Sequence, residues 1–432
     1  MSDLLRLATA GSVDDGKSTL VGRLLYDTKS VLADQIDAVT RASVDKGLST
    51  PDLSLLVDGL RAEREQGITI DVAYRYFATP KRSFVLADTP GHVQYTRNTV
   101  SGASTAQLVI LLVDARKGVI EQTRRHAAVL ALLGVPKLVL AVNKIDLVDN
   151  PAEVFAEISS EFNTLTSKLG WADEDVLEIP VSALHGDNIA SRSANTPYYD
   201  GPSLIEHLES VPVDADSTGT HALGLRFPVQ YVIRPRTAEY PDYRGYAGQI
   251  AAGSVSPGDE IVVLPSGKRT TVERVDTPDG ELAVAQVGRS VTLLLADEVD
   301  ISRGDIIASP ADAPEPIDTF DATVCWLGDK ALRPGARLLL KHGAKTTQAI
   351  VGALVERFDE QTLTAQESPE SLELNDIGRV SLRLAEPIPA DDYRTNRHTG
   401  SFLLIDPAGG NTLAAGLVGD VLTSVEVGTA VR

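Results

Sequence analysis

A phosphate-binding sequence stands near the N-terminus, where residues 11–18, GSVDDGKS, match the pattern G-x-x-x-x-G-K-[ST]. The run follows an apolar stretch of strand length, Leu4–Ala10, and precedes a helical pattern, Ser18–Tyr26. Glycines let the loop turn its N–H groups towards a β-phosphate, and the helix N-terminus adds partial positive charge. We expect Lys17 to neutralise the β- and γ-phosphates, and the Ser18 hydroxyl to coordinate Mg²⁺. The residues expected to contact the nucleotide here are Gly11, Ser12, Val13, Asp14, Asp15, Gly16, Lys17, Ser18 and Thr19.

A second motif, Asn143-Lys144-Ile145-Asp146, directly follows the apolar run Lys137–Val142 and predicts the base. A carboxylate at Asp146 accepts hydrogen bonds from N1–H and the exocyclic amine of guanine, and adenine offers no such pair of donors. We expect Asn143 to reach the edge of the base that carries the six-position oxygen, and the Lys144 stem to pack over the ring. Ser182, Ala183 and Leu184, at the end of the next apolar run, are expected to supply a backbone N–H to the same oxygen.

Two further segments are expected to contact the γ-phosphate. Asp88 ends an apolar run and is placed to hold Mg²⁺ through water, and the Gly91 N–H can bond a γ-oxygen. Thr69 lies between the phosphate loop and Asp88, where its hydroxyl and carbonyl could close over Mg²⁺ and the γ-phosphate. His92 follows Gly91 and either orients the attacking water or only shapes this loop. The catalytic candidates are therefore His92, Thr69 and Lys17, with Ser18, Thr69 and Asp88 around the metal.

Positioning these motifs requires an ordered scaffold, and the first half of the chain supplies one. Short apolar runs alternate with helical patterns such as Gln122–Leu133, which predicts a parallel sheet covered by helices on both faces. Beyond a polar stretch at residues 211–220, short alternating runs separated by turn signals replace the helices, as in small antiparallel barrels. We predict an α/β P-loop GTPase domain, residues 1–212, followed by two antiparallel β-barrel domains, residues 222–312 and 316–432.

Composition narrows the setting in which this chain works. The 432 residues carry a net charge of −20, which argues weakly against a general nucleic-acid binder because a phosphate backbone would be repelled. One cysteine, Cys325, rules out an internal disulfide framework and fits a reducing cytosol. The longest apolar runs have the length of strands, and no basic apolar leader is present. We expect a cytoplasmic protein with no membrane or nucleic-acid partner.

The motifs together resemble a known family. The phosphate loop, the REQGITID stretch at residues 64–71, DTPGH at 88–92, NKID at 143–146 and VSALHGDNI at 181–189 look like translation-factor GTPases of the elongation factor Tu and 1-alpha type. Ser12 stands where elongation factors usually carry a histidine. That feature and four further segments resemble the large GTP-binding subunits of bacterial sulfate adenylyltransferases: residues 102–108, 114–118, 122–126 and 244–248.

The resemblance implies a partner and a purpose. A separate small subunit would bind ATP and sulfate and form adenosine 5′-phosphosulfate and pyrophosphate, while this chain would hydrolyse GTP with Mg²⁺ and drive that reaction. Relatives sometimes carry a fused adenylyl-sulfate kinase, which is not expected in a sequence that stops at Arg432. The alternative is an elongation-factor-like GTPase that delivers aminoacyl-tRNA, since all the nucleotide motifs fit it equally. A third interpretation is a GTPase switch with an unknown partner.

Overall fold

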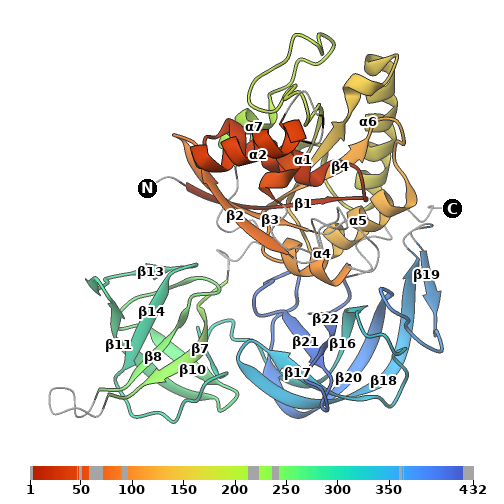
Figure 1. Ribbon diagram of the computed structural model, residues 1–432. Helices are drawn as coiled ribbons and strands as arrows, with labels where there is room; N and C mark the ends of the chain where they lie inside the picture. Colours follow the sequence, from red (N-terminus) through yellow and green to blue (C-terminus); the bar gives the residue numbers. More distant parts are fainter. Residues whose placement is uncertain are drawn as a thin grey trace. The chain divides into compact units, whose positions relative to one another are not determined.

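The computed structural model describes residues 3–45, 47, 51–57, 72–89, 96–212, 223–235, 243–359, 362 and 364–421. They fall into two compact units, the first built mainly of residues 1–213 and the second of residues 214–359 and 364–423 (Figure 1). Each unit has its own hydrophobic core.

The first unit alternates strands and helices along the chain, as its sequence predicts. Its strands are β1 (Asp3–Gly11), β2 (Ala73–Ala78), β3 (Arg82–Asp88), β4 (Leu108–Asp114), β5 (Lys137–Asn143) and β6 (Val176–Pro180). Its α-helices are α1 (Lys17–Asp27), α2 (Ala33–Asp45), α4 (Thr96–Ala103), α5 (Glu121–Leu132), α6 (Pro151–Lys168) and α7 (Leu204–Ser210). Among the residues that the structure describes, short 3₁₀ turns also occur at η1 (Leu53–Leu56), η3 (Ile145–Leu147) and η4 (Asp173–Asp175).

The six strands form one sheet in the order β2-β3-β1-β4-β5-β6. Pairings from β3 to β6 are parallel, as expected, whereas β2, a strand that the sequence did not predict, pairs antiparallel with β3. A tight turn explains the difference, since the Thr79 N–H donates to the Arg82 carbonyl at 2.9 Å, and a parallel pair needs a long crossover. The sequence did not reveal β2 because Tyr74 and Tyr76 are exposed and the strand has no apolar run.

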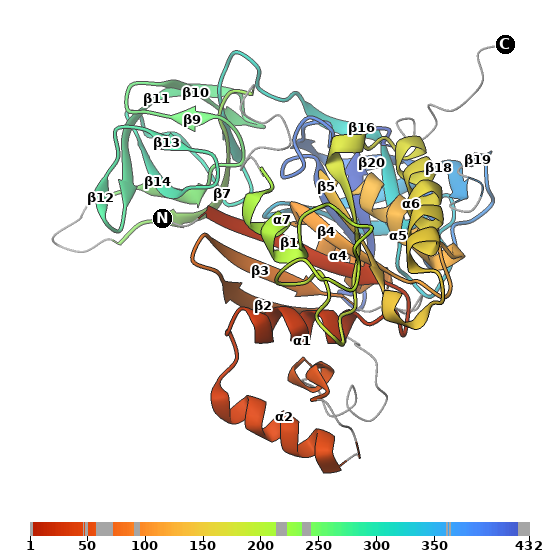
Figure 2. The same cartoon turned by 90° about the horizontal axis from the view of Figure 1, so that it is seen from above.

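Helices cover both faces of the sheet, which leaves its edge at the carboxyl ends of the parallel strands for a ligand. All seven residues of β4 are buried. Leu20 and Leu24 of α1 belong to the same hydrophobic core as Leu5 and Leu7 of β1. Helices α4 and α5 also contact β1, from the side of the sheet opposite to α1 (Figure 2). Parallel strands in such a sheet place their carboxyl ends along one edge, which is where ligands bind in open α/β folds. That edge carries Gly11, which ends β1.

The second unit contains two closed antiparallel barrels, which confirms the predicted fold class. In the first, six strands are paired in a ring in the order β10-β15-β7-β8-β14-β11, with β11 returning to β10. They are β7 (Arg226–Ile233), β8 (Gly245–Gln249), β10 (Glu260–Leu264), β11 (Lys268–Thr277), β14 (Ser290–Leu295) and β15 (Ile306–Ala308). Short strands β12 (Gly280–Glu281), β9 (Ser254–Val255) and β13 (Ala285–Gln286) accompany the ring.

The second barrel closes in the same way, in the order β17-β21-β22-β16-β20-β18, with β18 paired to β17. Its strands are β16 (Pro316–Trp326), β17 (Arg337–His342), β18 (Lys345–Asp359), β20 (Ile377–Pro389), β21 (Ser401–Ile405) and β22 (Thr412–Val418), and β19 (Thr364–Glu367) extends β18 as a hairpin. Strands β16, β18 and β20 are the longest of this barrel, and register shifts mark bulges in β18 and β20 that change the side-chain alternation part-way along.

A buried ion pair joins the two barrels within the second unit. Arg226, at the start of β7, is 1% exposed, and its Nε lies 3.1 Å from Oδ2 of Asp391, just after β20. The Thr399 hydroxyl donates to the same carboxylate oxygen at 2.5 Å, and the Arg226 Nη1 also lies 3.3 Å from Asp312. Buried charges are tolerated when they are paired and hydrogen-bonded in this way.

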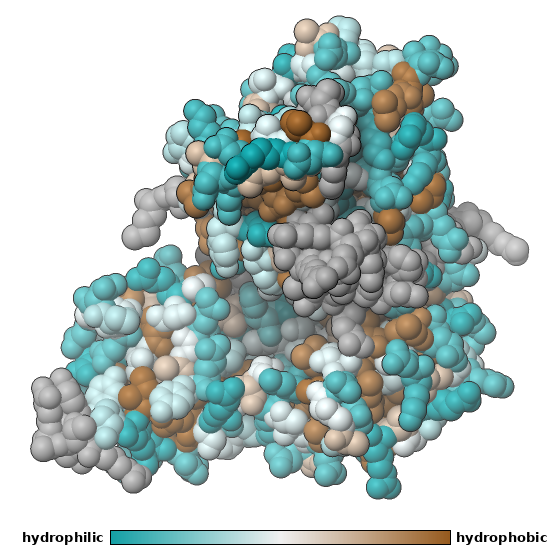
Figure 3. Space-filling model, viewed as in Figure 1, coloured by the Kyte–Doolittle hydropathy of each residue, from teal (hydrophilic) through white to brown (hydrophobic). Residues whose placement is uncertain are grey.

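Among the helices that the structure describes, none is long and apolar enough to cross a membrane. On the face seen in Figure 3, hydrophilic residues predominate and hydrophobic residues occur in small groups.

Candidate functional site

The loop between β1 and α1 has the backbone shape of an anion cradle. Asp14 and Gly16 adopt left-handed φ angles of 66° and 95°, and α1 begins at Lys17 with no side chain capping its N-terminal N–H groups. Glycine is required at position 16, because a Cβ there would lie 2.4 Å from the Asn143 Nδ2 atom. Successive N–H groups turned inward at a helix N-terminus fit a phosphate.

Lys17 lies at the centre of this loop. Its Nζ donates to the Gly11 carbonyl at 2.9 Å and to the Ser12 carbonyl at 2.8 Å. Burial lowers the pKa of Lys17, and the nearby carboxylates of Asp88 and Asp15 act in the opposite direction. The buried Ser12 hydroxyl has no hydrogen-bond partner among the described residues. Because buried polar groups are normally hydrogen-bonded, this hydroxyl indicates a position where a bound ligand supplies the partner.

Asp15 closes the loop rather than pointing out of it. Its Oδ2 accepts from the Ser12 N–H at 2.7 Å, and its side chain is almost fully buried. Burial raises the pKa of Asp15, against the lowering effect of that hydrogen bond. Ser18, the next expected contact, lies in the first turn of α1 and is half-buried, as is Thr19.

Asp88 ends β3 beside the phosphate loop and is oriented by β1. The Thr9 hydroxyl donates to Asp88 Oδ1 at 2.9 Å, and both residues are fully buried. The Thr89 hydroxyl in turn donates to the Thr9 carbonyl at 2.6 Å. A carboxylate oriented by Thr9 and close enough to Lys17 to affect its pKa suits a water-mediated Mg²⁺ contact, because carboxylate oxygens are among the ligands that this ion prefers.

Asn143, at the end of β5, connects the phosphate loop to the base loop, by which we mean residues 182–184. Its Nδ2 donates to the Asp15 carbonyl at 2.7 Å, and its Oδ1 accepts from the Ala183 N–H at 2.9 Å. Both polar atoms of the 2% exposed side chain are therefore engaged with the protein backbone. Asn143 therefore connects the two loops through its side chain. This role is additional to the contact with the edge of the base that the sequence predicts.

Lys144 has a left-handed φ of 61° and crosses back to the phosphate loop. Its Nζ donates to the Asp14 carbonyl and lies 2.9 Å from Asp114 Oδ2. Burial raises the pKa of Asp114, but hydrogen bonds from Arg116 and Lys144 outweigh that effect and hold the pKa well below its ordinary value. This ionised carboxylate fixes the Lys144 stem where the sequence predicts a surface for the base.

Comparison with known proteins decides the family. The model of the elongation factor Tu GTP binding domain matches residues 2–222, and the model of a GTP-eEF1A C-terminal domain-like region matches residues 319–419. Sulfate adenylyltransferase subunit 1 of Methylorubrum populi is 49% identical over 431 residues, covering 99% of this chain and 89% of its own. The chain belongs to the sulfate adenylyltransferase subunit 1 family of elongation-factor-Tu-like GTP-binding proteins.

Longer relatives share the same region. The bifunctional enzyme CysN/CysC of Mycobacterium tuberculosis (strain H37Rv) is 55% identical over 97% of this chain and 67% of its own length. The bifunctional enzyme NodQ of Rhizobium sp. (strain N33) is 50% identical over 96% of this chain and 63% of its own. Sup35 complexed with GDP aligns over 97% of this chain at 22% identity, with a TM-score of 0.43. This chain thus spans about two thirds of the length of the bifunctional members of its family.

Some predicted residues of the GTP-binding domain come together and others cannot be placed. The carboxyl ends of β1, β3, β5 and β6 bring together the phosphate loop, Asp88, the residues 143–146 and the residues 182–184. Thr69, Gly91 and His92 lie outside the described residues. No group of three or more potential metal ligands of the His, Cys, Asp or Glu type occurs in the part of the chain that the structure describes.

Several residues that the sequence did not indicate support the predicted site residues through hydrogen bonds. Thr9 orients Asp88, and Asp114 anchors Lys144. Arg23 of α1 donates to the carbonyls of Ala183 and Leu184. No pattern in a single sequence marks such supporting contacts, because they join segments that are more than twenty residues apart.

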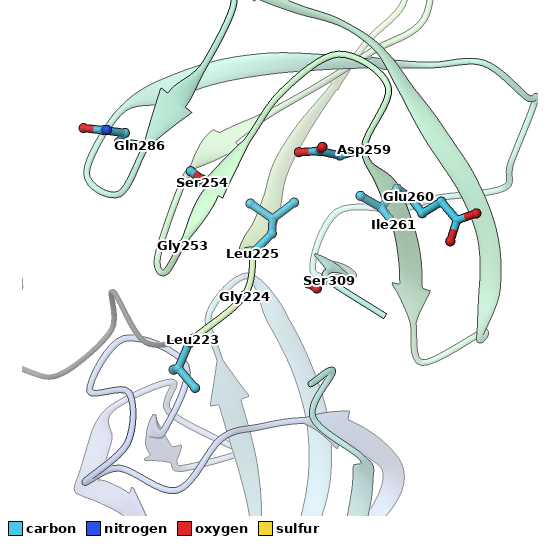
Figure 4. A pocket seen from close by; sticks show the side chains of 10 residues that line it. All are labelled: Leu223, Gly224, Leu225, Gly253, Ser254, Asp259, Glu260, Ile261, Gln286 and Ser309. Atoms are coloured by element: carbon cyan, nitrogen blue, oxygen red, sulfur yellow. The ribbon is translucent and has the colours of Figure 1, made fainter. Parts of the chain in front are cut away.

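The second unit carries a cavity of about 420 Å³ in the first barrel (Figure 4). Its polar lining includes Ser254, Asp259, Glu260 and Gln286. The Asp259 carboxylate is engaged locally, since its Oδ2 accepts from the Ser256 N–H at 2.8 Å. This cavity shows no arrangement of a nucleophile and a base.

Proposed function

We propose that this chain is the GTPase subunit of a sulfate adenylyltransferase. GTP hydrolysis here would drive the formation of adenosine 5′-phosphosulfate and pyrophosphate from ATP and sulfate on a separate small subunit. The proposal is carried by the likeness to Methylorubrum populi sulfate adenylyltransferase subunit 1, which extends over 99% of this chain. The joined phosphate and base loops of the first unit support the GTPase half of the proposal.

The phosphate end of GTP would be held by residues 11–19. Backbone N–H groups of the loop and of the α1 N-terminus would surround the β-phosphate, and the Ser12 hydroxyl is free among the described residues to donate to a phosphate oxygen. Lys17 would exchange its two carbonyl partners for β- and γ-oxygens, which restores a full charge partner to a buried ammonium.

Guanine would be read by Asp146, Asn143, Lys144 and the residues 182–184. Asp146 would accept from N1–H and the exocyclic amine, and a backbone N–H of residues 182–184 would donate to the six-position oxygen. His185 Nε2 lies 3.7 Å from Asp146 Oδ2, which places an imidazole beside this carboxylate. The specificity arises because adenine presents a donor where guanine presents an acceptor.

The metal would sit between Ser18 and Asp88, with Thr69 completing its surroundings. Mg²⁺ would supply neutralisation of the charge shared by the β- and γ-phosphate oxygens. Ser18 would offer its hydroxyl and Asp88 a carboxylate that Thr9 holds in place. His92 would orient the water that attacks the γ-phosphorus, and the bond from that phosphorus to the bridging oxygen would break to give GDP and phosphate.

Several finer statements belong to the same proposal. We infer domain boundaries at residues 1–212, 222–312 and 316–432, a small ATP- and sulfate-binding partner, and a cytoplasmic setting without membrane or nucleic-acid contacts. The elongation-factor-like alternative is not favoured, because the extended likeness is to sulfate adenylyltransferase subunits.

The experiment mixes the purified chain with its candidate small subunit and measures pyrophosphate release from ATP and sulfate, with and without GTP. We expect GTP to increase the amount of pyrophosphate released severalfold. The matched control is Asp146→Asn, which should shift base preference towards xanthine, so that XTP but not GTP stimulates the reaction. If neither nucleotide alters pyrophosphate release by either complex, the proposed function is wrong.

A further inference from the structure

One arginine of the phosphate-binding helix also contacts the base loop. Arg23 lies on α1, six residues after Lys17, and its Nε donates to the Ala183 carbonyl at 3.2 Å. Its Nη2 donates to the Leu184 carbonyl. None of the motifs that predict the nucleotide site includes this residue.

The arginine itself is held in place from α1. Asp27 Oδ1 lies 3.6 Å from its Nη1, one helical turn further on, and the guanidinium stands 5.8 Å from the centre of the Tyr26 ring. Its side chain is 17% exposed, and its hydrogen bond to the Ala183 carbonyl is partly buried, whereas the one to Leu184 is exposed. The planar guanidinium can bind two neighbouring carbonyls at once, which an ammonium does not do with a fixed geometry.

These contacts determine where one backbone N–H points. The Ala183 N–H is already engaged, because it donates to Asn143 Oδ1. The next N–H, that of Leu184, shares its peptide plane with the Ala183 carbonyl. Because a trans peptide is planar, an arginine that holds this carbonyl on one side directs the Leu184 N–H to the opposite side. No partner for the Leu184 N–H occurs among the residues that the structure describes.

We propose that Arg23 is a positioning residue for base recognition, which directs the Leu184 N–H at the six-position oxygen of guanine. The inference rests on the proposed guanine site and adds the group that sets its geometry. Arg23 does not touch the nucleotide. It fixes the peptide between Ala183 and Leu184, whose preceding N–H is held by Asn143, and so leaves the loop one donor at a defined place.

The experiment compares two nucleotides on the full-length chain. GDP carries the six-position oxygen, and 2-aminopurine riboside 5′-diphosphate lacks that oxygen and the N1–H but keeps the diphosphate and the exocyclic amine. Arg23→Met retains the apolar stem and removes the donors. We expect it to weaken GDP binding about tenfold, as for the loss of one hydrogen bond to the ligand, and to change binding of the 2-aminopurine nucleotide less than about twofold.

Three controls accompany this variant. Arg124→Met removes a comparable helix arginine, which pairs with Glu161 at 2.6 Å, and should leave both affinities unchanged. Asp27→Asn keeps the donors of Arg23 and should change GDP affinity less than about threefold. Thermal unfolding of each variant without nucleotide reports any general loss of structure.

The outcomes separate the two proposals. Equal weakening of both nucleotides by Arg23→Met, or no change in GDP affinity, overturns the role of Arg23 while the guanine site stands. A wild-type chain that does not prefer GDP over the 2-aminopurine nucleotide overturns the guanine site, and the role of Arg23 fails with it.

Discussion

The side-chain amide of Asn143 spans two loops, donating to the Asp15 carbonyl at 2.7 Å and accepting from the Ala183 N–H at 2.9 Å. One buried residue thereby sets the distance between the loop that fits the phosphates and the loop expected to read the base. A nucleotide needs both loops at once, so their separation is part of the binding site.

Asn143→Ala removes this link. Two buried backbone groups lose their partners, at roughly 1 to 3 kcal/mol each, so we expect the free energy of unfolding of the first unit to fall by about 2 to 6 kcal/mol. GDP affinity should fall at least about tenfold. Urea unfolding and nucleotide titration measure the two effects. Asn150→Ala, at an exposed helix start without a side-chain cap, is the control and should change neither.

Thr9→Val tests the orientation of Asp88. The substitution keeps the shape of the side chain and removes the hydroxyl that donates to Asp88 Oδ1. We expect the Mg²⁺ concentration that half-maximally slows GDP release to rise about fivefold to tenfold, because an unrestrained carboxylate loses part of its binding geometry. Thr9→Ser keeps the hydroxyl and should return this Mg²⁺ concentration most of the way to its value in the unsubstituted chain. The same loss in Thr166→Val, a buried threonine hydroxyl within α6, would argue that the change is general.

The stability of the first unit should depend on pH through its buried histidines. Burial lowers the pKa of His207 to about 4, and nearby Lys137 adds to the shift. Between about pH 6.5 and 4 the unfolded chain binds a proton that the folded chain does not, so stability falls as the pH falls.

We expect His207 to contribute a loss of up to about 1.4 kcal/mol per pH unit across this window. His207→Gln should flatten the dependence by that amount in urea unfolding at pH 7 and pH 5 without nucleotide. A slope unaltered by His207→Gln would contradict the prediction. His126, whose pKa burial lowers to about 3, should supply the remaining acid sensitivity.

Arg226→Met tests the ion pair that joins the barrels. Asp391 would be left buried without its charged partner, which costs about 3 to 5 kcal/mol. Adding Asp391→Leu should recover a large part of that loss, since a buried pair is often replaced by apolar residues at little cost. Urea unfolding of the second unit measures both variants. The partly exposed pair of Arg274 and Asp276 provides the control, and Arg274→Met should cost less than about 1 kcal/mol.

The sequence was most informative where local chemistry determines structure. The phosphate loop and Asn143-Lys144-Ile145-Asp146 both follow apolar strands, and the structure brings them together at one edge of the sheet. The apolar run Lys137–Val142 coincides with β5, which extends it by one residue to Asn143.

Contacts between distant segments could not be predicted in the same way. The antiparallel β2 depends on its turn, the length of β18 on bulges, and the roles of Thr9 and Arg23 on the approach of β3 and of the base loop. Such relationships depend on tertiary packing, which no pattern within one short segment encodes. Thr69, Gly91 and His92 stay predictions from sequence.

Lys17 and Arg23 stand on the same helix, one at the phosphate loop and the other at the base loop. Six residues of α-helix separate their backbones by about 9 Å along the axis. A rigid displacement of α1 would therefore disturb both ends of a bound nucleotide together. A helper that accelerates nucleotide exchange could act on this single element, without having to open the two loops in turn.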